Sequence, residues 1–232
     1  MRVRRGIPPA LAVAALVVLA GCTSAPSSLA RPATEASAPT PTPSAPGTPV
    51  VATIGDSIMS GHGLEDGADW PTLMSDDRDD TVVNVACSGA GFIAVGSCGS
   101  DFAGLIPAAV KDRPAIVIVQ GSDNDHTRSA AALDAATRAM IDTLHRALPE
   151  AQIVGLNTLW DQPTPAPAEI AYSSASVRAA VTAVGGVYVD IGQPLQGRLG
   201  LLQPDDEHPT VAGQQVLLQA VEAALDAAGV NI

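Results

Sequence analysis

The sequence contains few aromatic residues and few basic ones. Only six of its 232 residues are Phe, Tyr or Trp, which indicates a modest substrate pocket. Its 12 Lys and Arg residues stand against 24 Asp and Glu residues, so the formal net charge is −12. This excess of negative charge argues against nucleic acids and anionic phosphate surfaces as partners.

Long apolar stretches are also rare, and the clearest one lies at the N-terminus. Three arginines precede an apolar core over residues 10–20, and a Leu-Ala-Gly-Cys motif then ends at Cys22. An apolar core this short, with these flanks, predicts a signal peptide and not a membrane-spanning helix. The motif resembles the bacterial lipobox, so we expect residues 1–21 to be removed and Cys22 to carry lipid. Ordinary secretion, with cleavage near Ala25, is the alternative.

The chain after this signal divides into a tether and one domain. Pro, Ser, Thr and Ala occupy 23 of the 27 positions from 23 to 49. Such a segment has little apolar area to bury, so residues 22–49 are expected to be a lipidated, disordered spacer. A single acyl chain is a marginal anchor, and stable membrane attachment would require several chains on Cys22. Residues 50–232 have the size of one ordinary domain.

Cysteine is scarce as well, with three residues in the whole chain. If Cys22 carries lipid, Cys87 and Cys98 remain as a pair. Export would place them in an oxidising compartment, which favours a disulfide. Two buried free thiols are the alternative. Neither cysteine belongs to a spaced set of Cys and His residues, so no metal site is expected.

The domain alternates short apolar runs with helical patterns. The apolar runs lack a clean two-residue alternation, as is typical of parallel strands buried on both faces, and they cover residues 50–54, 81–85, 115–119, 152–156 and 187–191. Helical periodicity is clearest over residues 129–148, 177–184 and 211–228. This pattern predicts a three-layer α/β/α sandwich around a five-stranded parallel sheet. Its active site would lie beyond the carboxyl ends of the strands.

Two short motifs follow the first two predicted strands. Gly-Asp-Ser ends at Ser57, where a helix is expected to begin, so the hydroxyl would be exposed beside a free backbone donor. Alone, the tripeptide is more typical of a turn and a helix cap than of a nucleophile. Gly89 lies in a glycine-rich loop after the second strand and could offer its N–H to a ligand. A plain flexible loop is the alternative.

Two further motifs complete the candidate site. Asn124 follows the third strand, and its side-chain amide could donate a hydrogen bond to an oxyanion; an Asx turn is the alternative. Asp205 and His208 precede the last helix, at a spacing that can place the carboxylate against Nδ1 and leave Nε2 facing a serine. Asp206 is the competing partner for His208, and the adjacent position would tend to point it away.

Other histidines and tryptophans are weaker candidates. His62 and His126 lie in loops near the expected mouth of the site and could contact substrate. His145 falls within a predicted helix and is expected to be structural. Trp70 and Trp160 could line a pocket, but core or rim positions are favoured for both.

In this order and spacing, the four motifs resemble those of the SGNH (GDSL-type) hydrolase superfamily. The stretch from Asn84 to Phe92 and the paired cysteines look most like its secreted actinobacterial members. The resemblance extends over residues 50–232 and implies a flavodoxin-like fold. It also implies a nucleophile at Ser57, an oxyanion hole formed by Ser57, Gly89 and Asn124, and an acid–base pair in Asp205 and His208. Ser122 and Asp123 depart from the usual third motif, and the added carboxylate lies where an anion must be stabilised.

We therefore expect a serine-dependent carboxylic ester hydrolase that works outside the cytoplasm as a monomer, without metal or cofactor. Its substrates would be acylated carbohydrate or cell-wall material, or small lipid esters. A non-catalytic binding lipoprotein on the same fold is an alternative, although a complete catalytic set argues against it. A thioesterase is the other alternative, because the same groups could cleave a thioester.

Overall fold

The computed structural model describes residues 49–78 and 81–232. The expected signal peptide, the lipidation site at Cys22 and nearly all of the tether lie outside the described residues. No helix in the described ranges combines the length and the apolar character that crossing a membrane requires.

Five parallel strands form one sheet, in the order β2-β1-β3-β4-β5. They are β1 (Val50–Ile54), β2 (Thr81–Asn84), β3 (Ile116–Gln120), β4 (Gln152–Leu156) and β5 (Val187–Val189). The chain runs from β1 outward to β2 and then returns to place β3 on the other side of β1. This reversal creates a crevice beyond the carboxyl ends of β1 and β3, where ligands bind in sheets of this kind.

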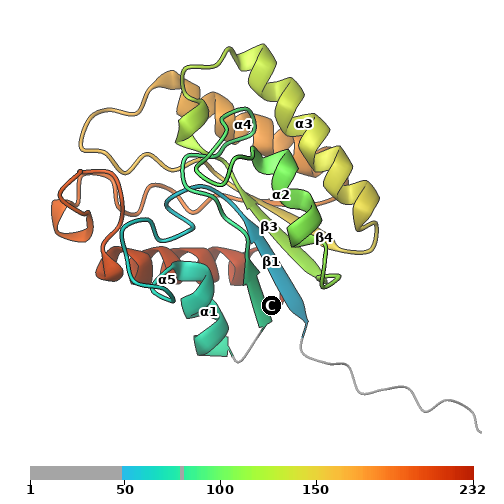
Figure 1. Cartoon of the computed structure of the whole chain (residues 1–232), viewed down its shortest axis with the longest axis horizontal. Helices are drawn as coiled ribbons and strands as arrows, with labels where there is room; N and C mark the ends of the chain where they lie inside the picture. Colours follow the sequence, from blue (N-terminus) through green and yellow to red (C-terminus); the bar gives the residue numbers. More distant parts are fainter. Residues whose placement is uncertain (1–48, 79–80) are drawn as a thin grey trace, which may run out of the picture. The chain divides into compact units, whose positions relative to one another are not determined.

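Both faces of the sheet are buried, which explains why the strands read as continuous apolar runs. Alternate residues of each strand enter opposite cores: Val51 and Ile118 lie in one, and Ala52 and Val117 lie in the other. The first core is closed by α1 (Trp70–Arg78) and α5 (Val211–Ala227). The second is closed by α2 (Phe102–Ala109), α3 (Ala130–Ala147) and α4 (Ala168–Ala183). Figure 1 shows these two groups of helices on either side of the sheet, and the predicted three-layer sandwich is confirmed.

Several helices differ from their predicted extent. The ends of α3 and α5 lie within a residue or two of the prediction, and both helices begin at a side-chain cap, from Ser129 and Thr210 respectively. In contrast, α4 starts nine residues earlier than expected, because serines interrupt the apolar period of its first half. The helices α1 and α2 were not predicted, and α2 contains Pro107, which normally signals a break.

The helix expected to begin at Ser57 is absent, and that prediction was wrong. The chain forms a series of turns instead, in which the amide of Ser60 donates to the carbonyl of Asp56 at 2.9 Å and that of His62 donates to Ser57 at 3.0 Å. The first helix after β1 begins only at Trp70. These turns return the chain to the crevice, so residues just beyond Ser57 can also line the site.

Candidate active site

The loops after β1, β2 and β3 meet the loop before α5 at the crevice. Ser57, Gly89, Asn124 and His208 come from these four loops, and all of them line one cavity of about 380 Å³. The structure therefore brings together all four sequence motifs, although they lie far apart along the chain.

Asp205 holds the ring of His208. Its Oδ2 atom lies 2.8 Å from His208 Nδ1, and its Oδ1 atom accepts hydrogen bonds from the backbone amides of Glu207 (3.1 Å) and His208 (3.0 Å). Burial alone would raise the pKa of Asp205, but the hydrogen bonds from His208 and Glu207 outweigh it and lower the pKa to about 2. An ionised Asp205 fixes the Nδ1–H tautomer and leaves Nε2 free to accept a proton. Asp206 makes no such contact with the ring.

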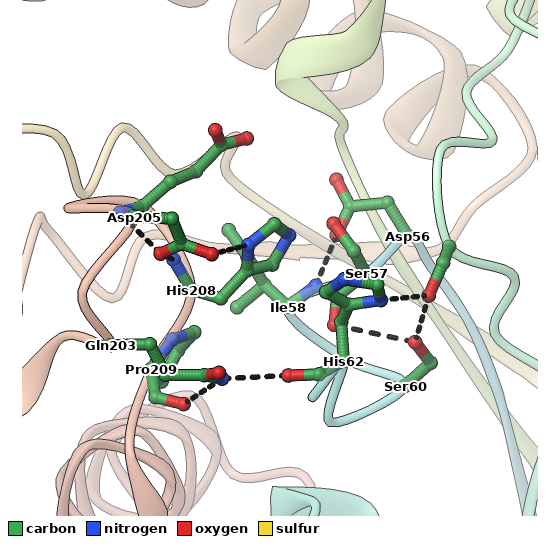
Figure 2. A network of polar contacts seen from close by, with 11 residues as sticks. Asp56, Ser57, Ile58, Ser60, His62, Gln203, Asp205, His208 and Pro209 are labelled. Atoms are coloured by element: carbon green, nitrogen blue, oxygen red, sulfur yellow. Dashed lines mark hydrogen bonds and ion pairs between the residues drawn. The ribbon is translucent and has the colours of Figure 1, made fainter. Parts of the chain in front are cut away.

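Ser57 and Asp205 lie on opposite sides of the His208 ring (Figure 2), and Ser57 and His208 line the same cavity. Its side chain is nearly buried, and the ring of His208 is 14% exposed. The structure contains no direct hydrogen bond between the Ser57 hydroxyl and His208. In enzymes without bound substrate such contacts are commonly long and tighten on binding. The shared cavity allows that approach.

Residues on either side of Ser57 fix a tight turn of the backbone at this position. Asp56 Oδ1 accepts a hydrogen bond from the amide of Ile58 at 3.0 Å. A Cβ atom at Gly55 would lie 2.6 Å from the Met59 sulfur, so this tight return of the chain requires glycine. Among the described residues, no group accepts a hydrogen bond from the amide of Ser57, which leaves this N–H available to a substrate oxygen.

Gly89 offers a second backbone donor from a firmly braced loop. Its φ of +79° lies in the left-handed region that favours glycine. Asp125 fixes the loop from one side, since its carboxylate accepts hydrogen bonds from three successive amides, at residues 92, 93 and 94. The expected disulfide between Cys87 and Cys98 is present and closes the loop from the other side.

Asn124 is oriented by contacts on one side of its amide. Its Nδ2 atom lies 2.9 Å from Ser122 Oγ and 3.2 Å from the carbonyl oxygen of Ala90, while Ser122 Oγ itself donates to that carbonyl at 2.9 Å. These two hydrogen bonds hold the side-chain amide in a fixed orientation. Asn124 also lines the cavity, at the position where the sequence predicts a third oxyanion donor.

Three buried carboxyl groups lie behind the cavity, and burial is the largest influence on each. It raises the pKa of Asp56 to about 6, that of Asp161 to about 7 and that of Asp123 to about 8. Near neutral pH, Asp123 therefore carries less negative charge than its sequence position suggests. Asp161 is 1% exposed, and neither of its carboxyl oxygens has a hydrogen-bond partner. No sequence pattern had singled out Asp161.

His62 has a closer relation to the site than the sequence suggested. Its ring centroid lies 4.5 Å from that of His208, and its Nδ1 atom lies 3.4 Å from Ser88 Oγ. The left-handed glycines on both sides, Gly61 and Gly63, turn this residue back into the cavity. The packing depends on Gln203, whose amide donates to the His62 carbonyl at 2.6 Å across 141 residues. Short-range sequence patterns could not indicate that contact.

The other weak candidates lie outside the cavity. The Nδ1 atom of His126 contacts the carbonyl oxygen of Asp123 at 2.8 Å, and its ring packs against Trp160. Trp70, the first residue of α1, is fully buried in the core, and Trp160 is 6% exposed. In the part of the chain that the structure describes, no cluster of His, Cys, Asp or Glu side chains could hold a metal ion.

Comparisons with known proteins bear on the family and the fold of this chain. The sequence profile of the GDSL-like lipase/acylhydrolase family matches residues 53–216. No curated protein sequence matches the chain. The solved structure of TesA has 25% sequence identity and a TM-score of 0.61, and the match covers 77% of this chain and 98% of TesA.

Two further solved structures share the fold at lower identity. The psychrotrophic esterase EstA from Pseudoalteromonas sp., inhibited by monoethylphosphonate, has 16% identity and a TM-score of 0.64, with 79% of this chain and 100% of that chain covered. A family two carbohydrate esterase from Clostridium thermocellum, in complex with cellohexaose, has 17% identity and a TM-score of 0.58, with 79% and 66% covered.

Proposed function

The chain belongs to the GDSL-like lipase/acylhydrolase family, and on that premise we propose that it is a serine esterase that cleaves small carboxylic esters through an acyl-enzyme. The observation that carries this proposal is the contact of 2.8 Å between Asp205 Oδ2 and His208 Nδ1, in a cavity that Ser57 also lines. A serine, an imidazole and a carboxylate in this relation have the roles that acyl transfer needs.

In the proposed mechanism, His208 Nε2 takes the proton of the Ser57 hydroxyl as its oxygen attacks the ester carbonyl. The bond from Ser57 Oγ to the carbonyl carbon forms, and Asp205 stabilises the imidazolium. The N–H groups of Ser57 and Gly89 and the amide of Asn124 donate to the tetrahedral oxyanion. The imidazolium then protonates the leaving alcohol. A water molecule, deprotonated by His208, then attacks the acyl carbon; the bond from that carbon to Ser57 Oγ breaks, His208 returns the proton to Oγ, and the acid is released.

The proposed substrates are esters with a short acyl group, including those of acylated carbohydrate or cell-wall polymers. A cavity of about 380 Å³ is small for a long acyl chain. The likeness to a carbohydrate esterase concerns the fold alone, so a sugar ester is part of the proposal and not a finding. A series of p-nitrophenyl esters from acetate to laurate, with an acetylated xylan alongside, tests this: kcat/KM should fall as the acyl chain lengthens.

The proposed location is outside the cytoplasm, on a tether whose lipid is attached at Cys22. The disulfide between Cys87 and Cys98 supports an oxidising compartment. We include a monomeric state in the proposal. Metabolic labelling with a radioactive fatty acid should label the wild-type protein but not a Cys22→Ser variant, and unlabelled wild type would favour ordinary secretion instead.

A direct experiment separates an esterase from a binding protein on the same fold. Wild type should hydrolyse p-nitrophenyl acetate, whereas Ser57→Ala should not do so above background. Equal rates would contradict the proposal, and absence of turnover in the folded wild type would favour a binding role. Ser60→Ala is a matched control, because it removes another hydroxyl three residues away. An acetyl thioester assayed in parallel tests the thioesterase alternative.

A further inference from the structure

The wall of the active-site cavity has an uneven distribution of charge. No lysine or arginine is among its lining residues, and Glu207 is the only acidic residue among them. The other lining side chains that can ionise are the imidazoles of His62 and His208. A substrate group that approaches the nucleophile therefore meets one carboxylate and no fixed positive charge.

Glu207 is held in place by its backbone and not by its side chain. Its amide donates to Asp205 Oδ1 at 3.1 Å, in the same turn that positions the adjacent His208. In the described part of the chain, no basic side chain forms an ion pair with the Glu207 carboxylate. The buried carboxyl groups of Asp56, Asp123 and Asp161 add no compensating positive charge; burial first, and the negative charge of Glu207 to a smaller extent, raises the pKa of each.

A carboxylate in this position opposes the reaction of a neutral ester. The tetrahedral intermediate of ester cleavage carries a negative charge, and the donors at residues 57, 89 and 124 exist to stabilise it. A like charge on the same cavity wall works against those donors. A positive charge on the substrate would reverse the sign of the interaction, because the carboxylate would then attract the bound molecule. The effect of Glu207 on the rate should thus depend on the charge of the substrate.

We propose that Glu207 determines substrate specificity, favouring esters that carry an ammonium group near the scissile bond and disfavouring those that carry a carboxylate or phosphate there. This inference rests on the proposed esterase function and specifies its substrate class. Esters of amino alcohols, and acylated sugars with a free amine, have the required chemistry. Glu207 contacts the substrate in this scheme and takes no part in proton transfer.

Three acetate esters that differ in charge test the proposal. Acetylcholine is cationic, 3,3-dimethylbutyl acetate is its neutral isostere, and O-acetylglycolate is anionic. The kcat/KM for each is measured by release of acid at low ionic strength. Wild type should prefer acetylcholine over the neutral ester. Glu207→Gln should reduce that ratio by about 5-fold and should raise the relative rate for O-acetylglycolate by a similar factor, as expected for one charge near the surface.

Asp206→Asn is the matched control. It removes the same charge one residue away, but Asp206 is exposed and does not line the cavity. Its φ of +59° is one that Asn adopts readily. We expect this variant to change the ratios less than 2-fold. Any general effect of Glu207→Gln on the basicity of His208 cancels in the ratios, since all three esters react with the same imidazole.

Two further measurements test whether the charge of Glu207 causes the preference. Salt at about 0.5 M should bring the wild-type ratios close to those of Glu207→Gln, because exposed charges are screened. Glu207→Lys should reverse the order of the cationic and anionic esters. If wild type hydrolyses the neutral ester but Glu207→Gln leaves all ratios unchanged, the specificity proposal is wrong and the esterase function stands. If folded wild type hydrolyses neither these three esters nor p-nitrophenyl acetate, the proposed function itself fails.

Discussion

The two sides of the active site are built differently. On the proposed oxyanion side, the loop that carries Gly89 is closed by a disulfide, and three backbone amides of the loop donate hydrogen bonds to the carboxylate of Asp125, which is 1% exposed. On the acid–base side, the side chain of Asp205 is 45% exposed, and hydrogen bonds within a short turn fix its position. The donors are thus preorganised by buried structure, whereas the histidine is held by a local motif at the surface.

This contrast has a physical basis. Oxyanion donors act only if they already point at the developing charge, and a rigid buried frame supplies that order before substrate arrives. The imidazole has to approach Ser57, transfer a proton to the leaving group and accept one again, so it needs some freedom. Substitutions that affect the histidine should therefore lower activity more than stability, whereas substitutions in the buried support of the Gly89 loop should lower stability.

The largest effect is expected on the acid–base side, for Asp205→Asn. An amide cannot stabilise the imidazolium and favours the wrong tautomer of His208, so kcat should fall by about 10³-fold or more. The melting temperature should change little, because the carboxylate is exposed. Steady-state kinetics and thermal unfolding on the same sample check this, with Asp206→Asn as control. A large loss of stability with modest loss of activity would reverse the assignment.

The next effect concerns the oxyanion side. Asn124→Ala removes one donor and should lower kcat by about 10²–10³-fold, while KM for a neutral ester changes little. Stopped-flow and steady-state kinetics with p-nitrophenyl acetate measure both constants. Asn157→Ala is a useful contrast, since Asn157 bonds to the chain near β5 and does not line the cavity. It should cost stability more than activity. A normal kcat in folded Asn124→Ala would contradict its role as a donor.

The disulfide between Cys87 and Cys98, which closes the Gly89 loop, should affect stability more than activity. Replacing Cys87 and Cys98 together by serine opens a short loop and should lower the free energy of unfolding by about 2–4 kcal/mol. Urea unfolding measures this change. Activity should fall as well, because the disulfide closes the loop that presents the Gly89 amide. Full activity in the double variant below its melting temperature would show that Asp125 is a sufficient support.

A separate effect is expected on the dependence of stability on pH. Burial raises the folded-state pKa values of Asp56, Asp161 and Asp123 to about 6, 7 and 8, all above the ordinary aspartate value of 3.8. The folded protein therefore binds more protons than the unfolded chain between about pH 4 and 8, and its stability should fall as the pH rises through this window. Asp161→Asn should make stability depend less on pH, whereas Asp112→Asn, at an exposed position, should not. Urea unfolding at several pH values provides the measurement, and equal slopes in all three proteins would exclude this cause.

The sequence predicted much of the fold because the relevant signals are local. The bounds of β1 and β4 agree with the apolar runs at 50–54 and 152–156, and α5 agrees with the last helical period. The signal fails where tertiary contacts override local preference. Pro107 lies inside α2, and the chain after Ser57 turns where a helix was expected, because Asp56 and Gly55 redirect it.

The residues of the candidate site likewise include some that local sequence patterns predict and others that depend on contacts distant in the sequence. Its four motifs could be proposed from the sequence because each follows a strand or precedes a helix, and the parallel sheet brings such positions together. The contact of His62 with His208 could not be proposed, since it depends on Gln203 from the far end of the chain. The unpartnered carboxyl group of Asp161 shows no local pattern at all.

The central claim is that the hydroxyl at position 57 is an activated nucleophile served by His208. A fluorophosphonate probe, followed by peptide mass spectrometry, tests it most directly, because the probe forms a covalent bond only with such a serine. We expect one label, on Ser57, at a rate that falls strongly in His208→Ala. A folded wild-type protein that remains unlabelled, or one labelled at another serine, would contradict it.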